Sequence, residues 1–297
     1  MDDSTRYKPR RVPKAVQRRI RGVDYHISEW GDPDSPPLFF LHGWGDAAGT
    51  FQFVVDELDD AHRIVAPDWR GFGRSSHTGP AYWFPDYLAD LDVLLDAYSP
   101  DEPVILIGHS MGANVAGLYA GALPDRVSAF VNIEGFGLAP TDPAGAPENY
   151  RRWIERSRAG ERFASYASFE ELARRLMRRN DRLTLERALF VAEQWAATDE
   201  EGVVRLRADA SHKLPNPVLY RREEAEACWR AVTAQVLLVT GAETDFKPAV
   251  KSWLDPDTSR HPFHGAPTEV VAGAGHMVHF DAPGALAAVI RRFLADL

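Results

Sequence analysis

An apolar run that ends in a glycine-serine-glycine pattern constrains this chain more than any other stretch. Residues 104–107 read Val-Ile-Leu-Ile, residues 108–112 read Gly-His-Ser-Met-Gly, and small residues typical of a helix follow. A strand that turns sharply into a helix crowds the backbone, and glycine removes the Cβ atoms that would clash. The pattern therefore predicts that Ser110 is exposed at the carboxyl end of a strand, beside a helix N-terminus that favours negative charge.

Short apolar strands alternate with amphipathic helices on both sides of this turn. Strand patterns occur at 16–20, 23–30, 38–41, 64–66, 104–107, 129–133, 235–240 and 268–271. Apolar residues at helical spacing occur at 51–58, 87–98 and 286–294. Strands that are apolar nearly throughout and alternate with helices indicate a parallel sheet covered on both faces. The first two strands are expected to form a hairpin.

The alternation is interrupted between about Leu138 and Leu219. A proline-rich stretch, 140–147, is followed by a sequence that we expect to be helical, without an apolar strand, from Tyr150 to about Ala197. Acidic residues nearly balance the many arginines of this segment, which predicts solvated helix faces with local ion pairs. We therefore expect an α/β core built from 1–137 and 220–297, with 138–219 as an insertion.

These motifs resemble those of the α/β-hydrolases. The 108–112 pattern is similar to the nucleophile elbow of that family, and 68–75 match its Asp-X-Arg-Gly-X-Gly-X-Ser loop. The resemblance implies a mostly parallel eight-stranded sheet flanked by helices, with 138–219 as a helical cap. It also implies a hydrolase that needs no cofactor. Dehalogenases and epoxide hydrolases of this fold carry aspartate where this chain has Ser110, so the sequence disfavours both chemistries.

The resemblance also nominates a catalytic triad. A serine hydroxyl needs an adjacent imidazole to accept its proton, and His276 follows Gly275 after the last predicted strand, where the family places its histidine. We expect Asp245 to be the acid that orients this imidazole, because it lies a few residues beyond the strand at 235–240. Glu134, at the end of the preceding strand, is the alternative acid, and His279 is expected to be structural.

Two backbone N–H groups are expected to stabilise the oxyanion of a tetrahedral intermediate. One belongs to Met111, directly after the serine. The other belongs to Trp44, because residues 42–45 (His-Gly-Trp-Gly) resemble the His-Gly turn of the family. The Trp44 indole and His109 are expected to line the substrate pocket, and His42 is expected to anchor the loop.

Composition narrows the partners and the compartment. The chain has 297 residues and a formal net charge of −9, which argues against nucleic acid as the main partner. No apolar run is long enough to suggest a membrane span or a signal peptide, and the only cysteine cannot form an internal disulfide. There is no metal-binding or phosphate-loop motif. We therefore expect a cytoplasmic enzyme, monomeric or homodimeric, that acts on a small molecule without a metal or cofactor.

The sequence favours a serine hydrolase that cleaves a carboxylic ester or thioester of a small, largely apolar substrate through an acyl-enzyme. Two alternatives stay open at this point. The same triad serves C–C bond hydrolases and cofactor-free haloperoxidases or perhydrolases. Some relatives of this fold are non-catalytic receptors for small molecules. The substrate itself is not encoded in any motif.

Overall fold

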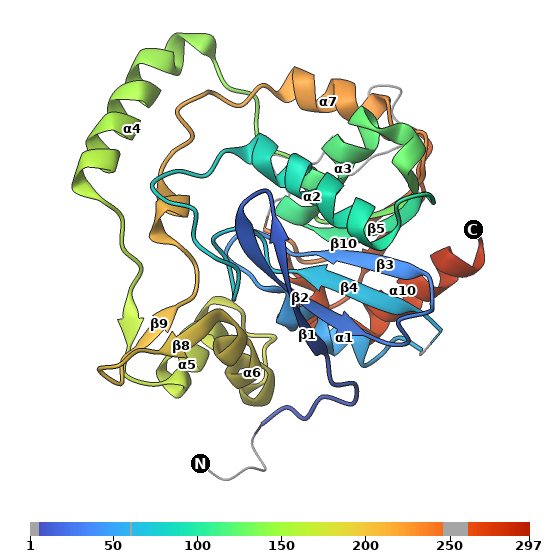
Figure 1. Cartoon of the computed structure of the whole chain (residues 1–297), viewed down its shortest axis with the longest axis horizontal. Helices are drawn as coiled ribbons and strands as arrows, with labels where there is room; N and C mark the ends of the chain where they lie inside the picture. The colour runs from blue at the N-terminus through green and yellow to red at the C-terminus, as the bar shows by residue number, and fades with distance from the viewer. Residues whose placement is uncertain (1–5, 60, 246–260) are drawn as a thin grey trace.

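The computed structural model describes residues 6–59, 61–245 and 261–297, and its centre is a sheet of eight strands (Figure 1). The strands are β1 (Lys14–Ile20), β2 (Val23–Trp30), β3 (Pro37–Leu41), β4 (Arg63–Pro67), β5 (Val104–His109), β6 (Val127–Ile133), β10 (Gln235–Gly241) and β11 (Thr268–Val271). Their order across the sheet is β1-β2-β4-β3-β5-β6-β10-β11. Strand β2 runs antiparallel to β1 and β4, and the other neighbours are parallel. The expected mostly parallel sheet is confirmed.

Helices cover both faces of this sheet (Figure 1). They are η2 (Ala48–Phe51), α1 (Gln52–Val55), α2 (Phe84–Tyr98), α3 (Met111–Ala122), η3 (Pro124–Arg126), α7 (Arg222–Arg230), α9 (Val278–Asp281) and α10 (Pro283–Ala295). Side chains of β3 alternate between the faces. Phe39 packs in the apolar cluster that includes residues of α2, α3 and α7, whereas Phe40 packs in the cluster of α1 and α10. The sheet is therefore buried on both sides.

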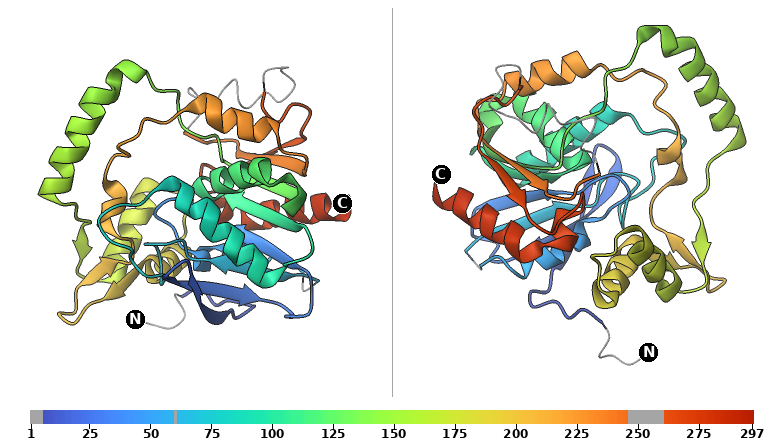
Figure 2. Two further views of the ribbon diagram at one scale, coloured as in Figure 1. Left: turned by 45° about the horizontal axis from the view of Figure 1, so that its top comes forward. Right: turned by 180° about the vertical axis from the view of Figure 1, so that it is seen from behind.

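The segment 138–219, called the insertion below, lies between β6 and α7 and projects from the rest of the molecule (Figure 2). It contains η4 (Pro143–Gly145), α4 (Ala146–Ala159), β7 (Ser165–Tyr166), α5 (Phe169–Arg179), α6 (Leu185–Trp195), β8 (Ala196–Thr198), β9 (Val204–Leu206) and η5 (Ala210–Lys213). The expectation that the chain is helical from Tyr150 to about Ala197 holds except at β7 and the start of β8, which form a small antiparallel sheet with β9. Strands of two or three residues are too short to show an alternating pattern.

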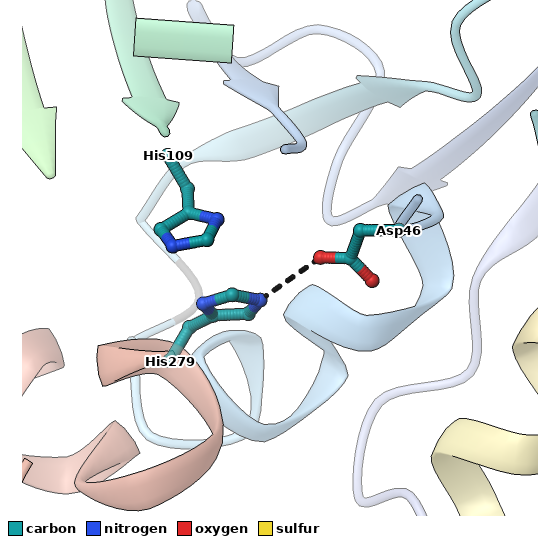
Figure 3. Close-up of side chains that lie close together, drawn as sticks. All are labelled: Asp46, His109 and His279. Carbon is teal, nitrogen blue, oxygen red and sulfur yellow. Dashed lines mark hydrogen bonds and ion pairs between the residues drawn. The ribbon is translucent and has the colours of Figure 1, made fainter. Parts of the chain in front are cut away.

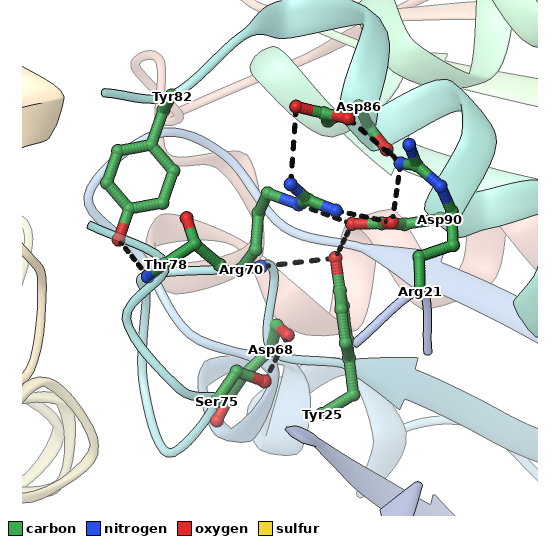
Figure 4. A network of polar contacts seen from close by, with 9 residues as sticks. All are labelled: Arg21, Tyr25, Asp68, Arg70, Ser75, Thr78, Tyr82, Asp86 and Asp90. Carbon is green, nitrogen blue, oxygen red and sulfur yellow. Dashed lines mark hydrogen bonds and ion pairs between the residues drawn. The ribbon is translucent and has the colours of Figure 1, made fainter. Parts of the chain in front are cut away.

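The loop after β4 is fixed by a buried network of polar side chains (Figure 4). Arg70 donates hydrogen bonds to both carboxylate oxygens of Asp90, at 2.5 and 2.7 Å, and the Tyr25 hydroxyl donates to the same carboxylate. The Ser75 hydroxyl donates to the backbone carbonyl of Asp68, at 2.6 Å. Because Arg70 and Asp90 are both buried, this network satisfies two charges that would otherwise be costly inside the protein. It holds the loop in place and contributes no group to the site described next.

Candidate active site

Ser110 lies at the turn between β5 and α3, in a backbone conformation that residues other than glycine rarely adopt. Its φ and ψ are 50° and −113°, and its backbone N–H donates to the Ile133 carbonyl at 2.8 Å. Close packing enforces this turn. A Cβ atom on Gly112 would lie 2.1 Å from the Leu41 carbonyl oxygen, and one on Gly108 would lie 2.5 Å from a backbone atom of α3. The strained serine persists because its surroundings leave no alternative, as is common at functional sites.

His276 lies in the loop after β11, and its ring stands between Ser110 and a carboxylate. Its Nε2 is 3.1 Å from the Ser110 Oγ, and its Nδ1 is 3.0 Å from Oε2 of Glu134. A carboxylate can only accept, so in the neutral ring Nδ1 carries the proton. The lone pair of Nε2 then faces the serine hydroxyl. This is the arrangement that a general base for Ser110 requires.

Glu134 is held in a fixed orientation at the end of β6. It is buried and has a φ of 56°. Its Oε1 accepts the Gly241 backbone N–H at 2.8 Å, and its Oε2 accepts the Thr244 hydroxyl at 2.6 Å. The backbone N–H of Glu134 donates to the Val239 carbonyl at 3.0 Å. Strand β10 and the residues that follow it therefore position the carboxylate that meets His276.

Asp245, the preferred acid of the sequence analysis, lies elsewhere. Its side chain is exposed, whereas the preceding residue, Thr244, is buried and bonded to Glu134. Glu134, the alternative acid, is the carboxylate that the structure brings to His276. The physical reason is that β6 and β10 are neighbouring parallel strands. Glu134 directly follows β6 and is held by Gly241 and Thr244, whereas Asp245 lies beyond these two residues and is exposed.

The two predicted oxyanion donors belong to residues close to Ser110: Met111 follows it in the chain, and Trp44 follows Gly43, which packs against it. Met111 is the first residue of α3, so its N–H has no acceptor within the helix. Trp44 follows Gly43, whose Cβ position lies 3.2 Å from the Cβ of Ser110, so the loop runs directly over the serine. The Trp44 indole is 52% exposed and stands edge-on to Phe72. The role of these two N–H groups in catalysis stays a prediction.

His42 and His109 are both buried. His42 accepts the Trp69 backbone N–H at Nε2 and donates from Nδ1 to the Gly43 carbonyl, which matches the expected anchoring role. His109 is 1% exposed, and its Nε2 donates to the backbone carbonyl of His276 at 2.9 Å. Because His109 is almost fully buried, its predicted place in the lining of the substrate pocket stays a prediction. Burial, and then the neighbouring His279 and His276, hold the pKa of His109 well below its usual value.

A second cluster of polar side chains, which the sequence analysis missed, lies beneath His276. Asp46, His109 and His279 bring potential metal-ligand atoms within 4.8 Å of one another (Figure 3). The Asp46 Oδ1 accepts from the Trp195 indole N–H and the Thr50 hydroxyl, and its Oδ2 accepts from His279. Because both oxygens are already engaged, we interpret the cluster as a hydrogen-bonded network. The signal for it was weak: one aspartate after the 42–45 turn and a second histidine near His276.

A cavity of about 410 Å³ lies where the insertion joins the core. It is lined from two segments, one between Pro140 and Tyr150 and one between Pro217 and Glu223. Neither Ser110, Glu134 nor His276 is among its lining residues.

Within the described ranges, no helix is long and apolar enough to cross a membrane.

Comparison with known proteins identifies the family. A family model for the alpha/beta hydrolase fold matches residues 36–283. This chain belongs to the alpha/beta hydrolases. A serine hydrolase-like protein from Danio rerio is 30% identical over 282 residues, covering 89% of this chain and 83% of the relative. Esterase YbfF from Escherichia coli (strain K12) is 27% identical over 270 residues, covering 89% of this chain and 94% of the relative.

Solved structures of other alpha/beta hydrolases superpose over almost the whole chain. The thioesterase domain from the curacin biosynthetic pathway has a TM-score of 0.83 at 23% identity, covering 94% of this chain and 99% of the other. A hypothetical protein from Pseudomonas aeruginosa PAO1 has a TM-score of 0.82 at 29% identity, covering 95% of this chain and 98% of the other. The fold and the esterase-like relatives of this alpha/beta hydrolase make it a hydrolase.

Proposed function

We propose that this alpha/beta hydrolase cleaves a carboxylic ester or thioester of a small, largely apolar substrate, with Ser110 as nucleophile. The observation that carries the proposal is the hydrogen-bonded chain from the Ser110 Oγ through His276 to Glu134, at 3.1 and 3.0 Å. Serine, imidazole and carboxylate in this order form the constellation of acyl-transfer enzymes. The names of the relatives, an esterase and a thioesterase domain, support this reaction class.

In the first half of the reaction, the Ser110 Oγ attacks the carbonyl carbon while His276 Nε2 accepts the hydroxyl proton. The tetrahedral intermediate carries an oxyanion, which the backbone N–H groups of Met111 and Trp44 stabilise. As the intermediate collapses, the bond to the alcohol or thiol breaks, and His276 returns the proton to that leaving group. The product is an acyl ester on Ser110.

In the second half, His276 accepts a proton from a water molecule that attacks the acyl carbon. As the second tetrahedral intermediate collapses, the bond from the acyl carbon to the Ser110 Oγ breaks, His276 returns its proton to that oxygen, and the carboxylic acid is released. Glu134 keeps the imidazole in the correct tautomer and stabilises the imidazolium that forms in both halves. All three groups belong to the core, so the insertion (138–219) is left to select the substrate as a cap. The exposed indole of Trp44 offers the acyl group an apolar wall.

The experiment is active-site labelling with a fluorophosphonate probe, followed by assays on p-nitrophenyl esters and acyl thioesters. We expect Ser110→Ala to abolish labelling and to lower kcat by on the order of 10⁴- to 10⁶-fold. Ser128→Ala is the matched control, because the Ser128 hydroxyl donates to the carbonyl of Val104, at the start of β5 and away from the turn that carries Ser110. Undiminished hydrolysis by a folded Ser110→Ala protein would refute the proposal. Ligand binding by a wild-type protein that turns over no ester would instead favour a receptor.

A further inference from the structure

Asp46 connects the insertion to the core at a single buried carboxylate. The indole N–H of Trp195, the last residue of α6, donates to Asp46 Oδ1 at 2.7 Å. On the core side, His279 Nε2 donates to Asp46 Oδ2 at 3.1 Å (Figure 3). The Thr50 hydroxyl also donates to Oδ1, at 2.9 Å. Burial alone would raise the pKa of Asp46, but the hydrogen bond and charge of His279, then the charge of His42 and the hydrogen bond from Trp195, hold it below its usual value.

His279 ties this carboxylate to the segment that carries His276. It lies three residues beyond His276 and is fully buried, with its ring packed against Phe280 and His109 at centroid distances of 4.3 and 4.4 Å. His109 in turn donates to the backbone carbonyl of His276. Two hydrogen bonds therefore hold the segment that carries His276: one joins His279 to Asp46, and the other joins His109 to the His276 carbonyl.

Trp195 reaches the same segment by a second route. Its ring lies 6.2 Å from that of Phe280, the residue after His279. If α6 shifts against the core, the Trp195 side chain therefore moves both its hydrogen bond to Asp46 and its ring contact with Phe280. Other polar contacts between α6 and the core bypass Asp46. Arg74 donates to the Gln194 side chain at 3.1 Å, Arg187 donates to the Phe280 carbonyl at 2.9 Å, and Arg6 pairs with Glu193 at 3.4 Å.

We infer that Asp46, Trp195 and His279 are positioning residues. Through them, the position in which α6 of the insertion packs on the core determines where His276 lies relative to Ser110. The inference rests on the proposed function, in which His276 is the general base. Proton transfer depends steeply on geometry, and a shift of about 1 Å in a reacting group can cost about 100-fold in rate. The coupling makes the reactivity of Ser110 depend on how α6 is docked.

The test compares Trp195→Phe with Gln194→Ala. Phenylalanine keeps an aromatic ring beside Phe280 and removes only the N–H that Asp46 accepts. Gln194→Ala is the matched control, because it removes a different contact between the same helix and the core. Each protein is assayed for kcat and KM on a p-nitrophenyl ester and for the rate of Ser110 labelling by a fluorophosphonate. Circular dichroism confirms folding.

We expect Trp195→Phe to lower kcat and the labelling rate together, by about tenfold, with KM changed less than twofold. Gln194→Ala should stay within twofold of wild type in all three quantities. His279→Gln keeps a side-chain N–H for Asp46 but loses the ring. It should lower kcat and the labelling rate about as much as Trp195→Phe does. Asp46→Asn should cost about 100-fold if it folds, and if it does not, the other two variants decide.

Equal behaviour of Trp195→Phe and Gln194→Ala would overturn the inference. A rise in KM with unchanged kcat and labelling would also overturn it, because Trp195 would then be a substrate contact. Ser110→Ala, measured in the same series, separates this failure from failure of the proposed function. If Ser110→Ala still hydrolyses the ester, the triad itself is wrong. If Ser110→Ala is inactive and Trp195→Phe is normal, only the coupling is wrong.

Discussion

Arg70 and Asp90 in the core form an ion pair whose side chains are 9% and 0% exposed, whereas Arg151 and Glu148 on α4 of the insertion pair with both side chains 63% exposed. The core pair is part of a network that fixes a loop, and removing Asp90 would leave the buried Arg70 only its longer pair with Asp86. The α4 pair is surrounded by water, which screens it. The two regions therefore tolerate change very differently, although both are rich in arginine.

The same difference applies to the groups that we assign to chemistry. Ser110, Glu134 and His276 all lie at strand ends of the core, and two of them adopt backbone conformations that only dense packing sustains. The insertion meets the core through an apolar cluster that α5 and α6 share with Phe53 and Phe280, and through single contacts such as those of Trp195 and His212. A packed core can hold reacting atoms to within a fraction of an ångström. The insertion carries none of these three groups, and we propose that it selects the substrate and, through Trp195, supports the position of His276.

The largest effect should come from the choice of acid. We expect Glu134→Gln to lower kcat by on the order of 10⁴-fold, because glutamine cannot stabilise the imidazolium of His276. Asp245→Asn is the matched control and should change kcat by less than twofold, since Asp245 is exposed. Both are measured as kcat on a p-nitrophenyl ester. If the two effects were reversed, Asp245 rather than Glu134 would be the acid of the triad. The conclusion that all three catalytic groups lie at buried strand ends of the core would then be wrong.

The next effect tests the ion pairs directly. Asp90→Asn should lower the free energy of unfolding by about 3–5 kcal/mol, because it removes the buried carboxylate that Arg70, Arg21 and Tyr25 share and leaves Arg70 only its longer pair with the part-exposed Asp86. Glu148→Gln, which disrupts the pair on α4, should change it by less than about 1 kcal/mol. Urea denaturation at pH 7 measures both. Similar costs for the two variants would show that the insertion is as tightly determined as the core.

The smallest effect concerns how the insertion docks. The ring of His212, from η5, is stacked between Phe72 and Tyr82 of the core, with centroid distances of 3.8 and 3.6 Å. Burial lowers the pKa of His212 to about 4; Asp209 opposes this shift and His77 adds to it. The unfolded chain, with a histidine pKa near 6.5, then binds more protons than the folded protein between about pH 6.5 and 4. Stability should fall as the pH falls through this window.

The loss of folding stability caused by His212 is at most about 3 kcal/mol, and this loss should be complete below about pH 4. The free energy of unfolding of wild type and His212→Gln, measured by urea denaturation from pH 7 to pH 4, isolates it. The difference between the two proteins should shift in favour of His212→Gln as the pH falls. A difference that does not vary with pH would mean that His212 titrates as a solvated histidine and that its stack does not control docking.

Much of the core could be predicted from local patterns, because each pattern is a property of neighbouring residues. The apolar runs that became β3, β5, β6 and β10 are buried on both faces, so they lack polar residues almost throughout. The turn at Ser110 can be predicted from the sequence, because contacts at the turn itself require its two glycines. His276 was predicted from its place after the last strand, and the structure brings it to Ser110.

The tertiary structure alone decided which carboxylate meets His276. Glu134 and Asp245 both follow strands that end at the same edge, so spacing does not separate them. The difference lies in the direction of one side chain, set by the positive φ of Glu134 and by donors from Gly241 and Thr244. The Asp46 network likewise joins residues that are 149 and 233 positions apart in the chain. Contacts of that range leave no local periodicity, because only the folded chain brings their partners together.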